Sequence, residues 1–427
     1  MNHQSPLFVG VDLGTSGVRG VCVDGLLQPV ASTAVSFDLE KDNRRDPHSW
    51  WQAVRTVLRG LVKQVDARQI VSIAVDGTSG TMLAVNDDGE PLGEALLYND
   101  ACTDQSILDR ISGHAPKSAA VHGATSGLAR AITLTEKHAG SSIMHEADWI
   151  ASRLTGMPGI SDENNALKTG YDPIAREWPE WIEATGLPRS RLPGVLPAGQ
   201  LIAPVHANAA ADMGLDTGTL IITGTTDGCA SFLATGAANS GEGVTVLGST
   251  LTIKLLSASP VCAPEYGIYS HRIGDTWLAG GASNTGGNVL AKFFTPQSIE
   301  QLSQKIDLSV PSTLDYYPLS RPGERFPIND GQLEPRLLPR ADNDTLFLYG
   351  ILEGIAGIEQ LAYQRLQELG APSLTSVRTV GGGALNNPWT KIRQRRLGVT
   401  FMQSYSDQAA IGSARLARDG FNSEAVK

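Results

Sequence analysis

The sequence predicts an α/β protein built from two similar halves, and three observations support this fold class. Apolar runs at 7–12 and 18–23 flank the turn Gly14-Thr15-Ser16-Gly17, which is typical of a β-hairpin. A second hairpin of this kind is expected over 243–256, around Gly248-Ser249-Thr250. Each half continues into a stretch with helical spacing of its apolar residues. Because hairpins replace a strict strand–helix alternation, a TIM barrel is disfavoured.

The remaining elements of the first half follow in order. A third strand is expected over 27–37. Asp46-Pro47 is typical of a helix start, and the apolar residues over 54–65 recur with i, i+3, i+4 spacing along one face. A buried strand over 70–75 ends at Asp76, and 82–85 begins another.

The middle of the chain is less regular. The stretch from about 113 to 201 has the weakest periodicity and many of the tryptophans and prolines, so we expect an elaboration of the first domain there. A strand over 220–222 precedes a helix that starts near Asp227. The second half adds a long helix over 351–369 and a strand over 377–380. We therefore expect one domain over 1–238 and another over 239–427.

Composition excludes several classes of protein. The net charge is 34 − 44 = −10, which disfavours a nucleic-acid partner, because such proteins usually carry a basic face. No apolar run reaches the ~20 residues of a membrane helix, so no membrane partner is expected. The four cysteines are far apart, and the first residues resemble neither a signal nor a transit peptide, so we expect a cytoplasmic protein.

The first candidate site is the turn that follows Asp12. Glycines let a backbone approach a ligand closely, and Thr15 and Ser16 add hydroxyl groups. Asp12 is a suitable ligand for Mg²⁺, which prefers carboxylate oxygen and keeps several waters. An ordinary hairpin turn also explains these residues.

The second candidate is Asp227, in the run Thr225-Thr226-Asp227-Gly228. A helix N-terminus stabilises the ionised carboxylate, which suits a base that accepts a proton from an alcohol. A helix-capping role is the alternative explanation.

Two glycine-rich turns in the second half are further candidates. Gly381-Gly382-Gly383 links a strand to a helix and precedes Ala384 and Asn386. Three glycines cost conformational entropy, so the close approach of a ligand or of another backbone would explain them. Gly280-Gly281 and Gly286-Gly287 flank Ser283-Asn284-Thr285 in a similar way.

The order of these motifs resembles that of the FGGY carbohydrate kinases, a family within the superfamily of actin, Hsp70 and hexokinase. FVGVDLGTSGVRG is similar to the first phosphate motif of the family, and TGTTDGCASFLATGA to the segment with its catalytic aspartate. GVTVLGSTLTI resembles the second phosphate motif, TVGGGALNNPWTKIRQRRLGV the adenosine motif, and QAAIGSARLA the closing segment. The resemblance implies two ribonuclease-H-like domains with a cleft between them, which use ATP and Mg²⁺.

The family's roles transfer to matching positions. The resemblance implies that Asp227 is the general base and that Asp12 organises Mg²⁺. On the sugar side, the residues implied to border the substrate and the transferred phosphoryl group are Asp12, Thr15, Ser16, Gly17, Asp76, Thr78, Ser79, Tyr98 and Asp100. On the nucleotide side they are Gly248, Ser249, Gly281, Thr285, Gly382, Gly383, Ala384 and Asn386.

The segment Asp76-Gly77-Thr78-Ser79 favours one substrate. It is more similar to the Asp-Ala-Thr-Cys-Ser run of ribulokinases than to the corresponding runs of xylulokinases or glycerol kinases, so the expected substrate is D-ribulose. D-xylulose or another polyol is the alternative. From a different class, a non-catalytic nucleotide-dependent clamp or sugar-binding protein of the same superfamily is also considered. The expected partners are the sugar and ATP, and the oligomeric state is left open, with a homo-oligomer among the options.

Overall fold

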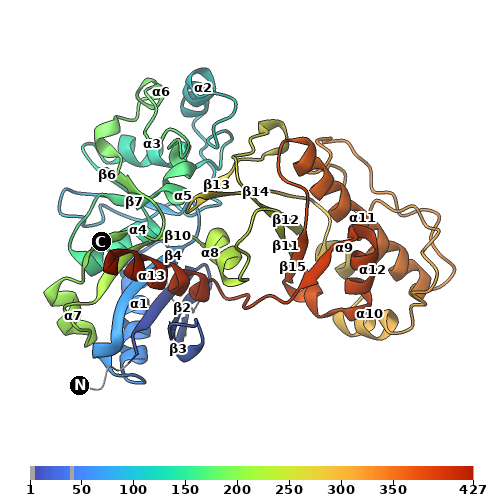
Figure 1. The fold of residues 1–427 in the computed structure, drawn as a ribbon. Helices are drawn as coiled ribbons and strands as arrows, with labels where there is room; N and C mark the ends of the chain where they lie inside the picture. The colour runs from blue at the N-terminus through green and yellow to red at the C-terminus, as the bar shows by residue number, and fades with distance from the viewer. Residues whose placement is uncertain (1–4, 39–42, 427) are drawn as a thin grey trace. The chain divides into compact units, whose positions relative to one another are not determined.

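A computed structural model describes residues 5–38 and 43–426, which form two compact units. The first unit comprises Met1–Ala234, His271–Gly274 and Gln408–Lys427, and the second comprises Thr235–Ser270 and Asp275–Asp407. Each unit contains a mixed β-sheet that begins with a hairpin (Figure 1). The predicted α/β class is confirmed.

The first unit is built on a sheet in which the three central strands run parallel. The predicted hairpin forms, and strands β4 and β10 then join β1 side by side in the same direction. In sheet order the strands are β3 (Pro29–Ser36), β2 (Gly17–Val23), β1 (Leu7–Gly14), β4 (Ile70–Gly77), β10 (Leu220–Thr226) and β9 (Leu201–Pro204).

Helix α1 (Pro47–Val62) covers this sheet with the apolar stripe that the spacing predicts. Its start follows the predicted rule, because the Asp46 side chain accepts the His48 N–H at 3.0 Å. Trp50, Val54 and Leu58 are buried on the inward face. Burial of this face, more than local propensity, stabilises the helix.

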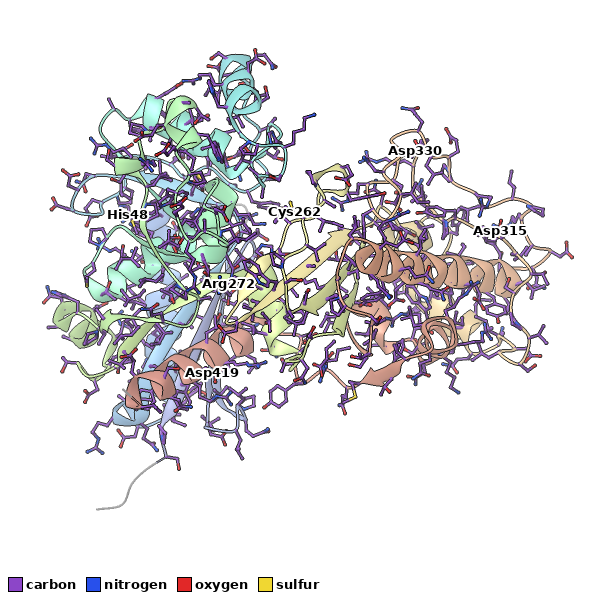
Figure 2. The ribbon with its side chains drawn as sticks, turned by 45° about the horizontal axis from the view of Figure 1, so that its top comes forward. His48, Cys262, Arg272, Asp315, Asp330 and Asp419 are labelled. Carbon is purple, nitrogen blue, oxygen red and sulfur yellow. The ribbon has the colours of Figure 1, made fainter. Side chains whose placement is uncertain are left out.

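The last helix of the chain, α13 (Ala409–Ala425), belongs to the first unit. In Figure 2, which labels Asp419 on this helix, α13 lies beside the blue strands of the first sheet. A Cβ atom on Gly10 of β1 would lie 1.8 Å from the Ala410 carbonyl oxygen, so helix and strand backbones are in direct contact. Ala410, Ala414 and Ala417 are buried at this interface. The expected domain 239–427 therefore differs from the compact units, because small residues pack α13 against β1 and β4.

The stretch expected to be irregular contains well-formed helices. They pack around a separate apolar cluster that includes Met82, Leu128, Ile132 and Ile182. Small and polar residues such as Ala129 and Arg130 occupy much of the buried face of α3, which weakens its apolar periodicity. The elements of this region are β5 (Met82–Val85), α2 (Gln105–His114), α3 (Gly127–Lys137), β6 (Ser142–His145), α4 (Glu146–Thr155), β7 (Ile160–Asp162), α5 (Glu163–Ala166), α6 (Trp181–Ala184) and β8 (Gly194–Leu196).

The second unit repeats the hairpin-led design. Its strands follow the order β14 (Thr276–Ala282), β12 (Leu251–Ser257), β11 (Glu242–Leu247), β15 (Ser376–Val380) and β16 (Thr400–Met402), and β11 and β15 run parallel. The predicted long helix is α11 (Asp344–Glu368), and α12 (Asn387–Leu397) packs beside it. Arg393 of α12 donates to Glu359 of α11 from Nε at 2.6 Å and Nη2 at 2.7 Å, both side chains being buried.

Candidate active site

Acidic residues gather at the carboxyl ends of three neighbouring parallel strands in the first unit. In the strand register, Asp12 of β1 lies opposite Asp76 of β4, and Asp76 lies opposite Thr225 of β10. Asp227 follows β10 directly and begins helix α8 (Asp227–Ala234). The sheet therefore brings together three aspartates that are far apart in the sequence, and ligands of such α/β sheets bind at this end of the strands.

Asp76 has no exposed surface and lies beside Asp12. Its Oδ2 accepts a hydrogen bond from Ser413 Oγ of α13 at 2.5 Å, and no donor in the described chain reaches its Oδ1. Burial, reinforced by the charge of Asp12, raises the pKa of Asp76 well above its usual range. Asp76 thus lies beneath the surface. A substrate would contact Asp12, and Asp76 would act on the substrate only by its effect on Asp12.

Asp12 is partly exposed and is the member of the pair that a ligand can contact. Burial raises its pKa, the hydrogen bond with Asp76 opposes that rise, and the charge of Asp227 adds to it. No group of three or more His, Cys, Asp or Glu residues within 5–38 and 43–426 is arranged to hold a metal ion. Mg²⁺ in phosphoryl-transfer enzymes is commonly held by one or two carboxylates together with water and phosphate, so Asp12 alone fits that role.

Asp227 is half-buried at the first residue of α8. Its Oδ1 accepts the Gly228 N–H at 2.7 Å, whereas the capping contact is made by Thr226 Oγ1, which accepts the Cys229 N–H at 3.4 Å. The helix-capping explanation therefore suits Thr226 better than Asp227. The carboxylate lies within electrostatic reach of Asp12 and Asp76.

The first hairpin turn presents the predicted hydroxyl groups. Thr15 and Ser16 are exposed, and the Ser16 carbonyl accepts the Phe37 N–H at 2.9 Å. Gly17 has a purely structural reason to be glycine, because its φ is 150° and a Cβ atom would lie 2.2 Å from the Val35 carbonyl oxygen. The turn thus offers two hydroxyls beside Asp12.

The segment after β4 is held by two residues that the sequence analysis missed. The Thr78 N–H donates to Glu146 Oε2 at 2.8 Å, and the buried Arg130 donates from Nε to the Gly80 carbonyl at 2.9 Å. The Ser79 hydroxyl oxygen is buried without a partner in the described chain. Neither Glu146 nor Arg130 lies in a motif. Charged side chains are rarely buried, so their burial is the only signal that could have singled them out.

Arg130 also positions the residues predicted beside the sugar. Its Nη1 donates to the carbonyls of Tyr98 at 3.0 Å and Asp100 at 3.2 Å. Tyr98 is 46% exposed, so its ring is accessible. The Asp100 carboxylate is engaged by Arg45, whose Nη2 donates to Oδ1 at 2.7 Å, and this hydrogen bond holds the pKa of Asp100 below its usual value. Asp100 is therefore already paired inside the first unit.

In the second unit, the ends of β11 and β15 bring two predicted turns together. Gly381 has a φ of 87°, and a Cβ atom on it would lie 2.7 Å from the Leu247 carbonyl oxygen and 3.3 Å from the Gly248 nitrogen. Gly382 is exposed, and a Cβ atom there would meet nothing within 4 Å. Ser249 is exposed on the facing turn. Adjacent turns with accessible backbone suit a phosphate-bearing nucleotide.

Gly383 differs from Gly382, because a Cβ atom on Gly383 would lie 2.7 Å from both Leu247 Cβ and Trp389 Cζ3. Packing within the second unit therefore explains this glycine without a ligand. The same holds for Gly281, where a Cβ atom would lie 2.6 Å from the Phe326 ring.

Three other predicted nucleotide residues make internal contacts. Thr285 is fully buried, and its hydroxyl donates to the Pro318 carbonyl at 2.5 Å. Asn386 caps α12 by accepting the Trp389 N–H at 3.0 Å, and its Nδ2 donates to Ser303 Oγ at 2.8 Å. The Ala384 N–H donates to the Gly381 carbonyl at 3.0 Å. The side chains of Thr285 and Asn386 thus make hydrogen bonds within the second unit, and their contact with a nucleotide stays a prediction.

Comparison with known proteins identifies the family of the chain. The family model described as "FGGY family of carbohydrate kinases, N-terminal domain" matches residues 7–126 and 128–234. The chain is 24% identical to the xylulose kinase of Bacillus subtilis (strain 168), covering 96% of this chain and 88% of that protein. It is 22% identical to the xylulose kinase of Escherichia coli (strain K12), covering 98% and 91%.

Among solved structures, the fold is similar to that of a structure described as a xyloylose kinase from Brucella ovis. The TM-score is 0.85 at 22% sequence identity, and the match covers 98% of this chain and 91% of that chain. Within residues 5–38 and 43–426, no helix combines the length and apolar character needed to cross a membrane. The family match spans more than half of the sequence and includes the three acidic strand ends, so the chain belongs to the FGGY family of carbohydrate kinases.

Proposed function

We propose that the protein transfers the terminal phosphoryl group of ATP to a hydroxyl of a ketopentose, with Asp227 as the general base. The observation that carries this proposal is the gathering of Asp12, Asp76 and Asp227 at the ends of three parallel strands. Asp227 is the only one of the three that begins a helix, and it is half-buried there, unlike the fully buried Asp76.

The chemistry follows from these positions. The sugar hydroxyl loses its proton to Asp227 as its oxygen bonds to the γ-phosphorus, and the bond from that phosphorus to the leaving oxygen of ADP breaks. Mg²⁺ held through Asp12 would neutralise charge on the phosphates. Thr15 and Ser16 present hydroxyl donors beside Asp12. The turns at Gly248-Ser249 and Gly382 would border the nucleotide, supported by the accessible Gly382 backbone.

D-ribulose is the substrate we propose, on the basis of the segment Asp76-Gly77-Thr78-Ser79. The buried, unpartnered Ser79 hydroxyl supports a polar contact with a substrate from this segment. D-xylulose is the second candidate, because the relatives in Bacillus subtilis and Escherichia coli are named xylulose kinases. The two sugars differ in configuration at C3, so discrimination requires a polar group near that carbon. The cytoplasm, which supplies ATP, is the proposed compartment.

The test is ADP release by the full chain with ATP and Mg²⁺, in the presence of D-ribulose, D-xylulose, other ketoses, or polyols. We expect release only with a ketopentose, and a higher kcat/KM for D-ribulose than for D-xylulose. A higher kcat/KM for D-xylulose than for D-ribulose would make D-xylulose the substrate and would still support the proposed reaction. The absence of sugar-dependent ADP release with the whole panel would favour a non-catalytic nucleotide or sugar-binding protein.

A further inference from the structure

Glu146 lies against the segment that we propose reads the sugar. It is the first residue of α4 and is 4% exposed. Its backbone N–H donates to the Thr81 carbonyl at 3.1 Å, and its Oε2 accepts the Thr78 N–H at 2.8 Å. A Cβ atom on Gly77 would lie 3.2 Å from the same Oε2, so the carboxyl fills the space behind this turn. One residue thus contacts the segment through both its backbone and its side chain.

The charges around Glu146 are unusual for a buried carboxyl. The charged groups that affect its pKa most are the carboxylates of Asp227 and Asp12, and no cation is among them. Burial, opposed by the Thr78 hydrogen bond and reinforced by these two charges, raises the pKa of Glu146 to about 8. At neutral pH the side chain is therefore mostly an uncharged carboxylic acid.

Arg130 holds the same segment at its other end. Its Nε donates to the Gly80 carbonyl, two residues beyond Thr78. The backbone between these contacts carries Ser79, whose hydroxyl oxygen is buried and has no partner among the described residues. A hydroxyl held at a defined position and left unpaired can discriminate between sugars by hydrogen bonding.

We propose that Glu146 is a positioning residue for substrate recognition, which holds the Thr78–Ser79 backbone by accepting the Thr78 N–H so that the Ser79 hydroxyl meets the ketopentose. This inference rests on the proposed function. Glu146 acts through Thr78 and takes no part in the transfer of the sugar proton.

Three substitutions separate the hydrogen bond from the charge. Glu146→Gln keeps an acceptor for the Thr78 N–H at the same length and is uncharged, whereas Glu146→Asp keeps the acid but shortens the side chain. Glu146→Ala removes the acceptor. Asp148→Asn is the matched control, because Asp148 is a buried acid on the same helix that hydrogen-bonds Ser161 and lies near Asp162. Steady-state kinetics of the full chain with ATP and the ketopentose give KM for each substrate and kcat.

We expect Glu146→Gln and Asp148→Asn to keep the ketopentose KM within about three-fold of wild type. Glu146→Asp and Glu146→Ala should raise the ketopentose KM about ten-fold or more, because a buried hydrogen bond is lost. The KM for ATP should not change. Impaired Glu146→Gln with active Glu146→Asp would overturn the inference, since charge would then be the essential property. Equal effects of Asp148→Asn and Glu146→Ala would also overturn it. If the wild-type protein shows no ketopentose-dependent turnover, the proposed function fails. If the wild-type protein is active and the Glu146 variants have the same ketopentose KM, only this inference is rejected.

Discussion

Ser413 Oγ donates a hydrogen bond to Asp76 Oδ2 at 2.5 Å, although the two residues are 337 positions apart in the chain. Both side chains are buried. Ser72, on the same strand, donates to the Ala417 carbonyl of the same helix at 2.8 Å. The last helix of the protein therefore supports the strand whose end adjoins Asp12.

Replacing Ser413 by alanine should leave the Asp76 carboxyl without its donor. An unsatisfied buried polar group costs about 1–3 kcal/mol, so the free energy of unfolding should fall by about that amount. Urea unfolding of the full chain measures the change. Ser423→Ala is the control, because Ser423 lies on the exposed side of α13 and should change stability by less than about 0.5 kcal/mol. An equally stable Ser413→Ala variant would mean that water replaces the serine hydroxyl.

Asp227→Asn should lower kcat by about 10²–10⁴-fold, which is the usual worth of a general base. The amide is nearly isosteric, and its oxygen can still accept the Gly228 N–H, so the KM values should change little. Steady-state kinetics with the preferred ketopentose give both parameters. A variant that retains more than about a tenth of wild-type kcat would exclude Asp227 as the base.

The glycines of the triple turn should respond differently to substitution. Gly382→Val should fold with wild-type thermal stability, because its side chain meets open space, but should weaken ATP binding by calorimetry. Gly383→Val should instead lower the melting temperature, because the new atoms overlap Leu247 and Trp389. The sequence predicts that both glycines border the nucleotide. Because Gly383 is packed against Leu247 and Trp389, Gly382 is the better position at which to test this prediction. Unchanged ATP affinity in Gly382→Val would show that the turn only connects strand and helix.

Glu146 should make stability depend on pH. Its pKa is raised from 4.5 to about 8 in the folded protein, so the folded state binds the proton more tightly than the unfolded state. The contribution of Glu146 to stability is complete below about pH 4.5 and is lost progressively as the pH rises through about 8. Glu146→Gln cannot ionise, so its stability relative to wild type should increase between these values. Urea unfolding at several pH values measures this, and a constant difference would show that Glu146 is ionised throughout.

Local sequence patterns predicted those helices and strands whose starts or turns are marked by neighbouring residues. Asp46-Pro47 marks the start of α1, alternating apolar and turn residues mark both hairpins, and α8 starts at Asp227 as expected. These signals depend on residues within one or two turns of each other. The same patterns led to the family and to the acidic strand ends.

Long-range contacts could not be predicted in this way. Glu146 meets Thr78 across 68 positions, and Arg130 meets Gly80 across 50 positions, in a region whose periodicity is weak. Thr285 and Asn386 show the opposite case, in which a motif position is taken up by internal hydrogen bonds. Periodicity and motif order reveal which residues are polar and where the backbone turns, whereas the partner of a buried polar group depends on tertiary packing.

The placement of α13 also orders events during protein synthesis. Strands β1, β4 and β10 are translated well before helix α13, which packs against them. At ordinary elongation rates the nascent first sheet waits roughly ten to forty seconds for this helix. Until then α13 does not bury Gly10, Ala74 and Ile222, and Asp76 has no hydrogen bond from the Ser413 hydroxyl. The first unit is thus completed only after α13 has been made, so a chain released before this helix yields no finished acidic site.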